Sequence, residues 1–159
     1  MKRMRIFMPL AAVCWLLAGC AGPGDGSSAP TGPVADYRNS RAEVVVLNFF
    51  DMYCHTCQTM APHAKELHQA VQRRGLGSKV EFYAIGWGNT PMECEMYRKR
   101  FGVTYQIIPD KDLSISRRFG RFRPPLMIVL RKQGGGLTEI ARFTDLRGKQ
   151  DEILAKIIP

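Results

Sequence analysis

Apolar and polar residues follow two patterns along this chain, one typical of buried strands and the other of amphipathic helices. A nearly continuous, valine-rich apolar run at residues 44–50 (VVVLNFF) predicts a buried strand. After it, apolar side chains recur at every third or fourth position from Cys57 to about Arg74. This spacing predicts an amphipathic helix, which Gly75 and Gly77 end. A buried strand followed by a helix therefore opens the folded part of the chain.

The rest of the chain continues this alternation. Thr90 begins a Thr-Pro-Met-Glu sequence, which combines an N-cap, a first-turn proline and a capping-box glutamate, and predicts a helix to about Phe101. A glycine triplet at residues 134–136 marks a hairpin. The remaining strands are expected at residues 79–85, 105–108, 126–130 and 137–143, and the remaining helices at residues 112–119 and 149–158. This order predicts an α/β fold with a mixed central sheet and helices on both of its faces.

The N-terminal part, residues 1–42, follows neither of these two patterns. A basic start precedes the apolar stretch Ile6–Leu17, which is shorter than the ~20 residues that span a bilayer but suits a signal peptide. The sequence Leu-Ala-Gly-Cys that ends at Cys20 resembles the lipobox of bacterial lipoproteins, in which the cysteine is lipidated and becomes the mature N-terminus. The Gly-, Pro- and Ser-rich residues that follow predict a flexible tether. We therefore expect a signal peptide at 1–19, a lipidated cysteine and tether at 20–42, and a folded domain at 43–159.

Composition and charge narrow the class of protein. The chain has 159 residues, which suits one domain at ~100–200 residues per domain, and an apolar share of 45% excludes wholesale disorder. The formal charge of +9 falls to +6 once residues 1–19 are removed. Export to the cell envelope argues against nucleic acid as a partner. We therefore expect a solvated basic surface and no nucleic-acid binding.

The five cysteines divide by position. Cys14 lies in the expected signal peptide, and Cys20 is the expected lipidation site. Cys94 lies on the apolar stripe of its predicted helix, where a buried and inert thiol is expected. Cys54 and Cys57 remain as a pair that can do chemistry.

This pair forms a Cys-His-Thr-Cys motif between the first strand and the first helix. Unpaired N–H groups at a helix start favour a thiolate, so we expect a lowered pKa and a nucleophilic sulfur at Cys54. The short spacing lets Cys57 attack a mixed disulfide and release the product. His55 can add to the stabilisation of the thiolate if it is protonated or hydrogen-bonded. The motif thus favours redox chemistry without a metal or other cofactor.

Other uses of the motif fit the sequence less well. A c-type haem site needs histidine directly after the second cysteine, where Gln58 stands. Structural zinc needs four ligands, which only Cys94 and scattered histidines could complete. A purely structural disulfide in so tight a loop would constrain little of the unfolded chain. These alternatives stay open but are disfavoured.

Residues 48–57 (NFFDMYCHTC), with Pro62 five positions after the second cysteine, resemble thioredoxin-fold proteins of the TlpA/ResA type. Further matching blocks lie at residues 83–86, 101–103, 108–110 and 119–130. The resemblance covers about residues 43–158 and implies a thioredoxin-like fold. It also implies a lipid-anchored thiol:disulfide oxidoreductase of the bacterial envelope, facing the periplasm or the extracytoplasmic side. The implied partners are envelope proteins with disulfides, such as apocytochrome c, and a membrane thiol carrier as electron donor.

The resemblance also carries over individual residues. Pro125 corresponds to the cis-proline that lies against the redox cysteines and binds substrate backbone, with Pro124 as the alternative register. Tyr53 stands where the family usually has tryptophan, and it is expected with His55 to contact the substrate. Asp51 stands where alanine is usual, and it is expected either to face solvent or to lie near the thiols.

Two further interpretations remain open. A thioredoxin-fold copper-binding protein would hold Cu(I) with Cys54, Cys57 and a histidine, although such relatives usually separate their cysteines by three residues. Four arginines precede Pro125, namely Arg117, Arg118, Arg121 and Arg123. They either form a solvated face or attract acidic partners and favour the thiolate. His63 and His68 are expected to be solvated rather than to bind a metal.

Overall fold

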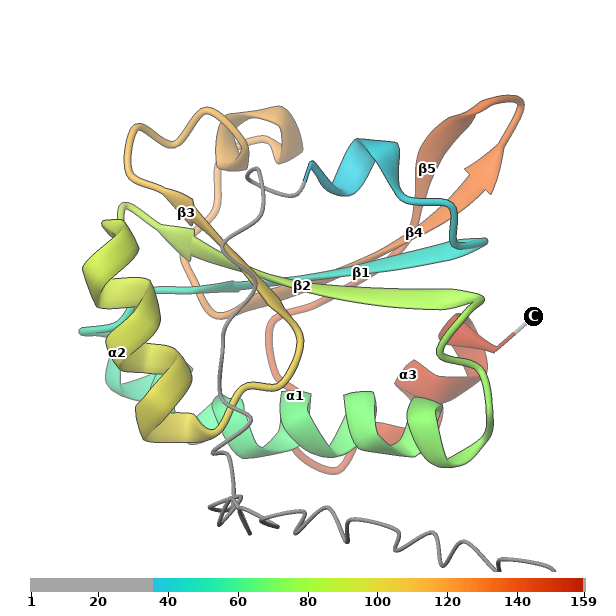
Figure 1. Cartoon of the computed structure of the whole chain (residues 1–159), viewed down its shortest axis with the longest axis horizontal. Helices are drawn as coiled ribbons and strands as arrows, with labels where there is room; N and C mark the ends of the chain where they lie inside the picture. Colours follow the sequence, from blue (N-terminus) through green and yellow to red (C-terminus); the bar gives the residue numbers. More distant parts are fainter. Residues whose placement is uncertain (1–35, 159) are drawn as a thin grey trace, which may run out of the picture. The chain divides into compact units, whose positions relative to one another are not determined.

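The structure, a computed structural model, describes residues 36–158 (Figure 1). The strands are β1 (Val44–Phe50), β2 (Val80–Trp87), β3 (Gln106–Asp110), β4 (Leu126–Gln133) and β5 (Gly136–Phe143). The α-helices are α1 (His55–Arg73), α2 (Pro91–Phe101) and α3 (Gln150–Ile157), and two short 3-10 helices are η1 (Tyr37–Asn39) and η2 (Ser116–Phe119). The expected signal peptide, lipidated Cys20 and most of the tether lie outside the described residues.

The sheet has the strand order β3-β2-β1-β4-β5. β1 and β2 are parallel, as are β2 and β3, whereas β4 runs antiparallel to both of its neighbours. All seven residues of β1 are buried, as its continuous apolar run predicts for a central strand. At its carboxyl end, Phe50 lies opposite Gly86 of β2, and Phe49 lies opposite Leu126 of β4. The motif that follows β1 therefore lies at the carboxyl end of the central strand of the sheet.

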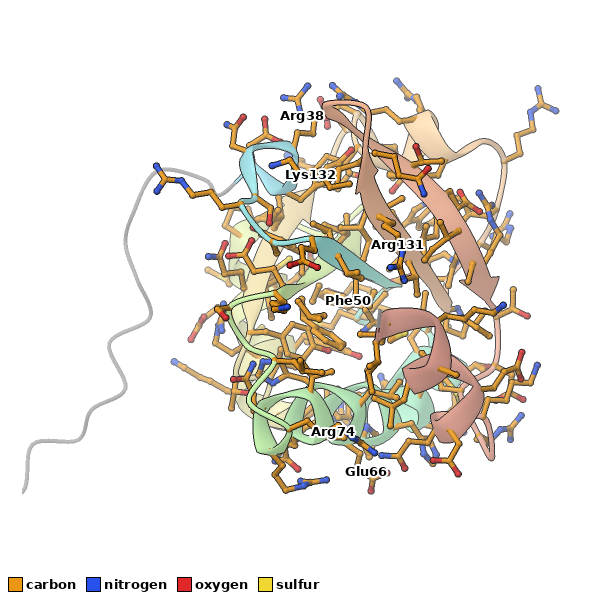
Figure 2. All side chains as sticks on the ribbon, turned by 90° about the vertical axis from the view of Figure 1, so that its right-hand side faces the viewer. Arg38, Phe50, Glu66, Arg74, Arg131 and Lys132 are labelled. Atoms are coloured by element: carbon orange, nitrogen blue, oxygen red, sulfur yellow. The ribbon has the colours of Figure 1, made fainter. Side chains whose placement is uncertain are left out.

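Helices cover both faces of the sheet, as predicted, but they differ between the faces (Figure 1). The core on one face joins buried side chains of α1, α2 and α3 to residues of β1, β2 and β4 such as Val46 and Phe82. The core on the other face is covered by η1 and by residues at and around η2, which pack on Leu47 and Phe49. Figure 2 shows Phe50 inside the molecule, with Arg74 and Glu66 on the outer side of the helical layer.

Two segments differ from the sequence prediction. The helix expected at residues 112–119 is reduced to η2, because the carboxylate of Asp110 accepts the N–H groups of Ile115 and Ser116 and holds the chain in a loop. Tyr37 is buried against Tyr83 and Phe119, so the folded part includes residues expected in the tether. Among the helices of residues 36–158, none is both long and apolar enough to cross a membrane.

Candidate active site

Cys54 is the N-cap residue of α1, directly after the turn that leaves β1. Its backbone N–H donates to the carbonyl of Asp51 at 3.1 Å, and its carbonyl accepts the N–H of Gln58 at 3.1 Å. Its sulfur accepts the N–H of Cys57 at 3.3 Å. A helix N-terminus and a directed N–H both favour negative charge on the sulfur atom. The predicted position of this cysteine at the start of the helix is confirmed.

The two cysteines of the motif differ in access to solvent. Cys54 is half-buried, whereas Cys57 is 1% exposed and belongs to the core beneath α1. Burial raises the pKa of Cys57 well above its ordinary value, and a hydrogen bond with Cys54 raises this pKa further. Cys54, Cys57 and Cys94 are free thiols. An incoming reagent therefore meets Cys54 first, with a protonated Cys57 beside it.

A cis peptide bond joins Pro124 to Pro125, immediately before β4. The carbonyl oxygen of Pro124 lies 3.8 Å from the sulfur of Cys54. The prediction that Pro125 is the cis-proline, rather than Pro124, is confirmed. The structure therefore brings residues that are about 70 positions apart in the sequence together at one site.

Tyr53 and His55 flank Cys54 along the chain, and both are exposed. The side chain of Tyr53 is largely open to solvent (71% exposed), yet its hydroxyl donates to the carboxylate of Glu93 at 2.7 Å. Glu93 in turn accepts the N–H and hydroxyl of Thr90 in the predicted capping box at the start of α2. The ring of Tyr53 is thus held in place from a second element. Within residues 36–158, the side chain of His55 takes part in no hydrogen bond or ion pair.

Asn89 is a residue of this site that sequence reasoning missed. Its side chain is buried, with 3% exposed, and its oxygen accepts the N–H of Met52 at 3.0 Å. Its amide nitrogen lies 3.5 Å from a carboxylate oxygen of Asp51, which also accepts the N–H of Tyr53. Asn89 therefore holds the turn before Cys54 from the end of β2. Asp51 is half-buried in this network rather than fully solvated.

The predicted burial of Cys94 is confirmed, at 3% exposed. Burial raises the pKa of this thiol to about 12. Its sulfur lies so close to Gly86 that an added Cβ on the glycine would clash with it. One turn further along α2, Tyr97 stacks on Phe50 with ring centroids 3.8 Å apart. Its hydroxyl donates to the carbonyl of Cys57 at 3.4 Å, so α2 supports the site from below.

Two further features bear on the function of the site: groups of metal-ligating side chains, and pockets. Within residues 36–158, no three or more His, Cys, Asp and Glu side chains gather where they could hold a metal ion. The set of two cysteines and a histidine that the copper alternative requires is therefore not assembled there. A pocket of about 520 Å³ lies on the sheet face opposite α1, between Tyr37, Phe119 and Leu137. None of its lining residues belongs to the turn or to the motif around Cys54.

The chain is similar in sequence to a known family and to several known proteins. The sequence profile of the AhpC/TSA family matches residues 29–134. The thiol-disulfide oxidoreductase ResA of Geobacillus thermodenitrificans is 28% identical over 116 residues, covering 69% of this chain and 64% of that protein. The ResA protein of Bacillus subtilis is 22% identical over 152 residues, covering 84% and 83%. The chain thus spans slightly less than two thirds of the first of these relatives.

Solved structures show the same arrangement of strands and helices. A secreted disulfide oxidoreductase of Mycobacterium tuberculosis matches with a TM-score of 0.57 and 18% identity, covering 72% of this chain and 80% of that one. A thioredoxin-like protein of Aeropyrum pernix matches with a TM-score of 0.59 and 15% identity, covering 75% and 80%. At these identities the likeness concerns the fold. The expected thioredoxin-like fold is confirmed.

Proposed function

The chain belongs to the AhpC/TSA family, and we propose that within this family it is a thiol:disulfide oxidoreductase whose working pair is Cys54 and Cys57. The observation that carries this proposal is the asymmetry of the pair. The accessible sulfur of Cys54 caps a helix beside a cis-proline. The buried residue Cys57 donates its backbone N–H to that sulfur. The ResA proteins that are similar to this chain are named thiol-disulfide oxidoreductases, which supports the same activity for this chain.

Different roles are proposed for the two cysteines, in line with their different exposure. The thiolate of Cys54 attacks one sulfur of a substrate disulfide, and the substrate's S–S bond breaks as a mixed disulfide forms. The released substrate thiolate takes the proton that Cys57 gives up. The Cys57 thiolate then attacks the sulfur of Cys54, frees the second substrate sulfur, which takes a proton from water, and leaves a Cys54–Cys57 disulfide. Two electrons have passed from the protein's dithiol to the substrate.

Three residues around Cys54 are proposed to contact the substrate. Pro125 presents backbone beside the reacting sulfur, as the Pro124 carbonyl at 3.8 Å from it indicates. The exposed ring of Tyr53, held by Glu93, offers a flat apolar surface on another side. His55 is exposed at the first position of α1 and lies open to a bound polypeptide.

The setting of the reaction is proposed from the N-terminal sequence and the relatives. Residues 1–19 form the signal peptide, Cys20 carries the lipid, residues up to the start of the folded part form a tether, and the domain works in the bacterial envelope. Its partners are envelope proteins with disulfides, apocytochrome c being one candidate, and a membrane thiol carrier that returns electrons to the Cys54–Cys57 disulfide. Reduction of substrates is the proposed direction.

A redox titration of the full chain against glutathione or dithiothreitol tests activity and direction together. A reductant is expected to have a potential near the ~ −270 mV of thioredoxin, whereas a value near the ~ −120 mV of DsbA would make the protein an oxidant. Cys57→Ser should accumulate a mixed disulfide through Cys54 with its natural partner, because the resolving thiol is missing. Cys54→Ser is the matched control and should trap no partner. Absence of any Cys54–Cys57 redox couple would overturn the proposal.

A further inference from the structure

The connection between β3 and β4 carries a concentration of arginines that the proposed mechanism does not use. Residues 111–123 contain five basic residues and one acidic residue. Four of the basic residues are arginines, and all four are exposed: Arg117, Arg118, Arg121 and Arg123. This connection lies over the sheet face opposite α1 (Figure 1). Its charge therefore faces solvent on one side of the molecule.

Three of these arginines are uncommitted. Elsewhere on the surface, Arg142 and Arg147 pair with carboxylates at 2.8 Å. Among residues 36–158, by contrast, the side chains of Arg117, Arg121 and Arg123 take part in no hydrogen bond or ion pair. Their guanidinium groups keep all of their donors for a ligand. The fourth, Arg118, donates to the carbonyl of Ser114 at 3.4 Å and is partly committed within the chain.

The backbone that carries the arginines is nevertheless fixed. Asp110 is 1% exposed, and its carboxylate accepts the backbone N–H groups of Ile115 and Ser116 at 2.9 Å each. The hydroxyl of Ser116 donates to the same carboxylate at 2.5 Å. Further along, the ring of Phe122 packs edge-on against Phe49 with centroids 4.9 Å apart. A ligand that binds the arginines therefore has to order side chains but not the segment itself.

The arginines are continuous with the redox site. Arg123 directly precedes Pro124, whose carbonyl oxygen lies 3.8 Å from the sulfur of Cys54. Arg117 and Arg121 line a pocket of about 170 Å³ together with Trp87 and Phe122. The pocket and the cis-peptide thus border the same short stretch of chain. A polypeptide whose disulfide is at Cys54 therefore lies beside the segment that carries Arg123.

We propose that Arg117, Arg121 and Arg123 form a docking surface for an acidic segment of the protein whose disulfide Cys54 reduces. This inference rests on the proposed function and adds the chemistry of its substrate. Guanidinium groups bind carboxylates bidentately, and uncompensated charge beside a reactive site raises the association rate of oppositely charged partners. The position of the surface favours a protein over a lipid headgroup, because a membrane lying on it would cover Cys54.

Matched peptides and variants test the proposal. The substrates are three disulfide peptides that differ only in flanking residues, which are glutamate, glutamine or lysine. The variants, in the full chain purified in nonionic detergent, are the triple substitution R117Q/R121Q/R123Q and its control R41Q/R73Q/K156Q. The control removes the same charge from exposed side chains away from the site. The measurement is the second-order rate constant of peptide reduction by the reduced protein, at low and high salt.

The wild-type protein is expected to reduce the glutamate peptide fastest. At low salt, the first triple variant should reduce the glutamate peptide roughly tenfold more slowly than the wild type, because charge steering changes association rates by 10-fold or more. High salt should reduce this difference between the two proteins. The control variant should keep the preference. The glutamine peptide, hydroxyethyl disulfide and the redox potential should be unaffected, which separates docking from stabilisation of the Cys54 thiolate.

Other outcomes overturn the inference. Equal rates for the three peptides, or an equal loss in the control variant, would show that the arginines select no partner. A changed redox potential that accounts for the rates would make them thiolate-stabilising residues. A loss confined to binding of phosphatidylglycerol vesicles would assign the surface to lipid. If the reduced wild-type protein reduces neither the peptides nor hydroxyethyl disulfide, the proposed function itself fails.

Discussion

Two segments meet at the sulfur of Cys54, and they are built in opposite ways. In residues 51–57, the turn is tied down by side chains: Asp51 and Asn89 accept its backbone N–H groups, and Glu93 holds the ring of Tyr53. In residues 111–125, one buried carboxylate, that of Asp110, fixes the backbone, and the side chains of three of the four arginines are left free.

The difference suits the two tasks proposed for them. A nucleophile must keep its geometry to within a fraction of an ångström, because misplacement of a reacting group is costly to the rate. A surface that attracts a partner by charge needs no such accuracy, and long exposed side chains that move freely act well at a distance. The first segment thus supports chemistry and the second recognition. The following experiments separate these roles.

The largest expected effect is the difference in reactivity between Cys54 and Cys57 in the first segment. Iodoacetamide at pH 7 should modify Cys54 faster than Cys57 or Cys94, by roughly a hundredfold or more, since only the thiolate reacts. Burial raises the pKa of Cys57 and raises that of Cys94 to about 12, so both remain thiols far above neutral pH. Mass spectrometry of the labelled peptides measures the three rates. Comparable labelling of Cys57 in the folded protein would show that the asymmetry of the pair is absent.

The second segment should be most sensitive at Asp110. Asp110→Ala removes the acceptor of two backbone N–H groups and one hydroxyl, and should lower the free energy of unfolding by about 2–4 kcal/mol, since buried donors left unpaired are expensive. Denaturant unfolding gives the change. Asp112→Ala is the matched control, because that carboxylate is exposed and accepts a single N–H, from Ser114.

A functional measurement sharpens the same comparison. If the loop serves recognition, folded Asp110→Ala should lose preference for acidic peptides while its rate with hydroxyethyl disulfide stays near that of the wild type. Equal losses with both substrates would mean that Asp110 supports the chemistry of Cys54 as well, and the division between the two segments would not hold.

Asn89 should have a smaller effect, confined to the first segment. Asn89→Ala leaves the N–H of Met52 without its partner and should cost about 1–3 kcal/mol of stability. It should also shift the redox potential of the Cys54–Cys57 pair, which a purely structural residue would leave alone. Asn39→Ala, at an exposed position in η1, provides the control. An unchanged potential in the Asn89 variant would show that the turn before Cys54 holds without this amide.

The sequence predicted the parts of the fold that depend on local pattern. The valine-rich run of β1 and the capping box of α2 both have signals within a few residues, and both are found. The cysteine motif and Pro125 were found because spacing and resemblance mark them without any knowledge of contacts. A strand, a cap or a motif carries its cause in neighbouring residues, which is why one sequence suffices.

The residues that escaped prediction act across the fold. Asn89 and Asp110 are polar residues near strand ends, and such residues are usually exposed. Nothing in their neighbours shows that one accepts the N–H of Met52 and the other folds residues 111–120 into a loop. Tyr37 lies in a stretch of tether-like composition, and its burial depends on Tyr83 and Phe119, far along the chain. Partners at long sequence separation decide these cases.

The smallest expected effect comes from a third region, remote from both segments. His68 was expected to be solvated, but its ring is half-buried, 5.2 Å from the ring of Phe82 and 5.0 Å from that of Tyr105. Burial lowers the pKa of His68, so the folded state favours the neutral ring. The unfolded chain takes up a proton near pH ~6.5. The stability contributed by the neutral ring is therefore fully present above that pH and is lost as the pH falls.

Unfolding of the wild type, His68→Gln and His63→Gln at pH 7 and pH 5 measures this contribution. The wild type and His63→Gln should both lose stability between the two pH values, and His68→Gln should lose less, because it has no ring to protonate. Peptide reduction at pH 7 should be unchanged in both variants, since His68 touches neither segment. If His68→Gln lost as much stability as the wild type, the acid sensitivity would arise elsewhere. If it slowed reduction, the site would extend further into the helical layer than the contacts of Cys54 and Cys57 indicate.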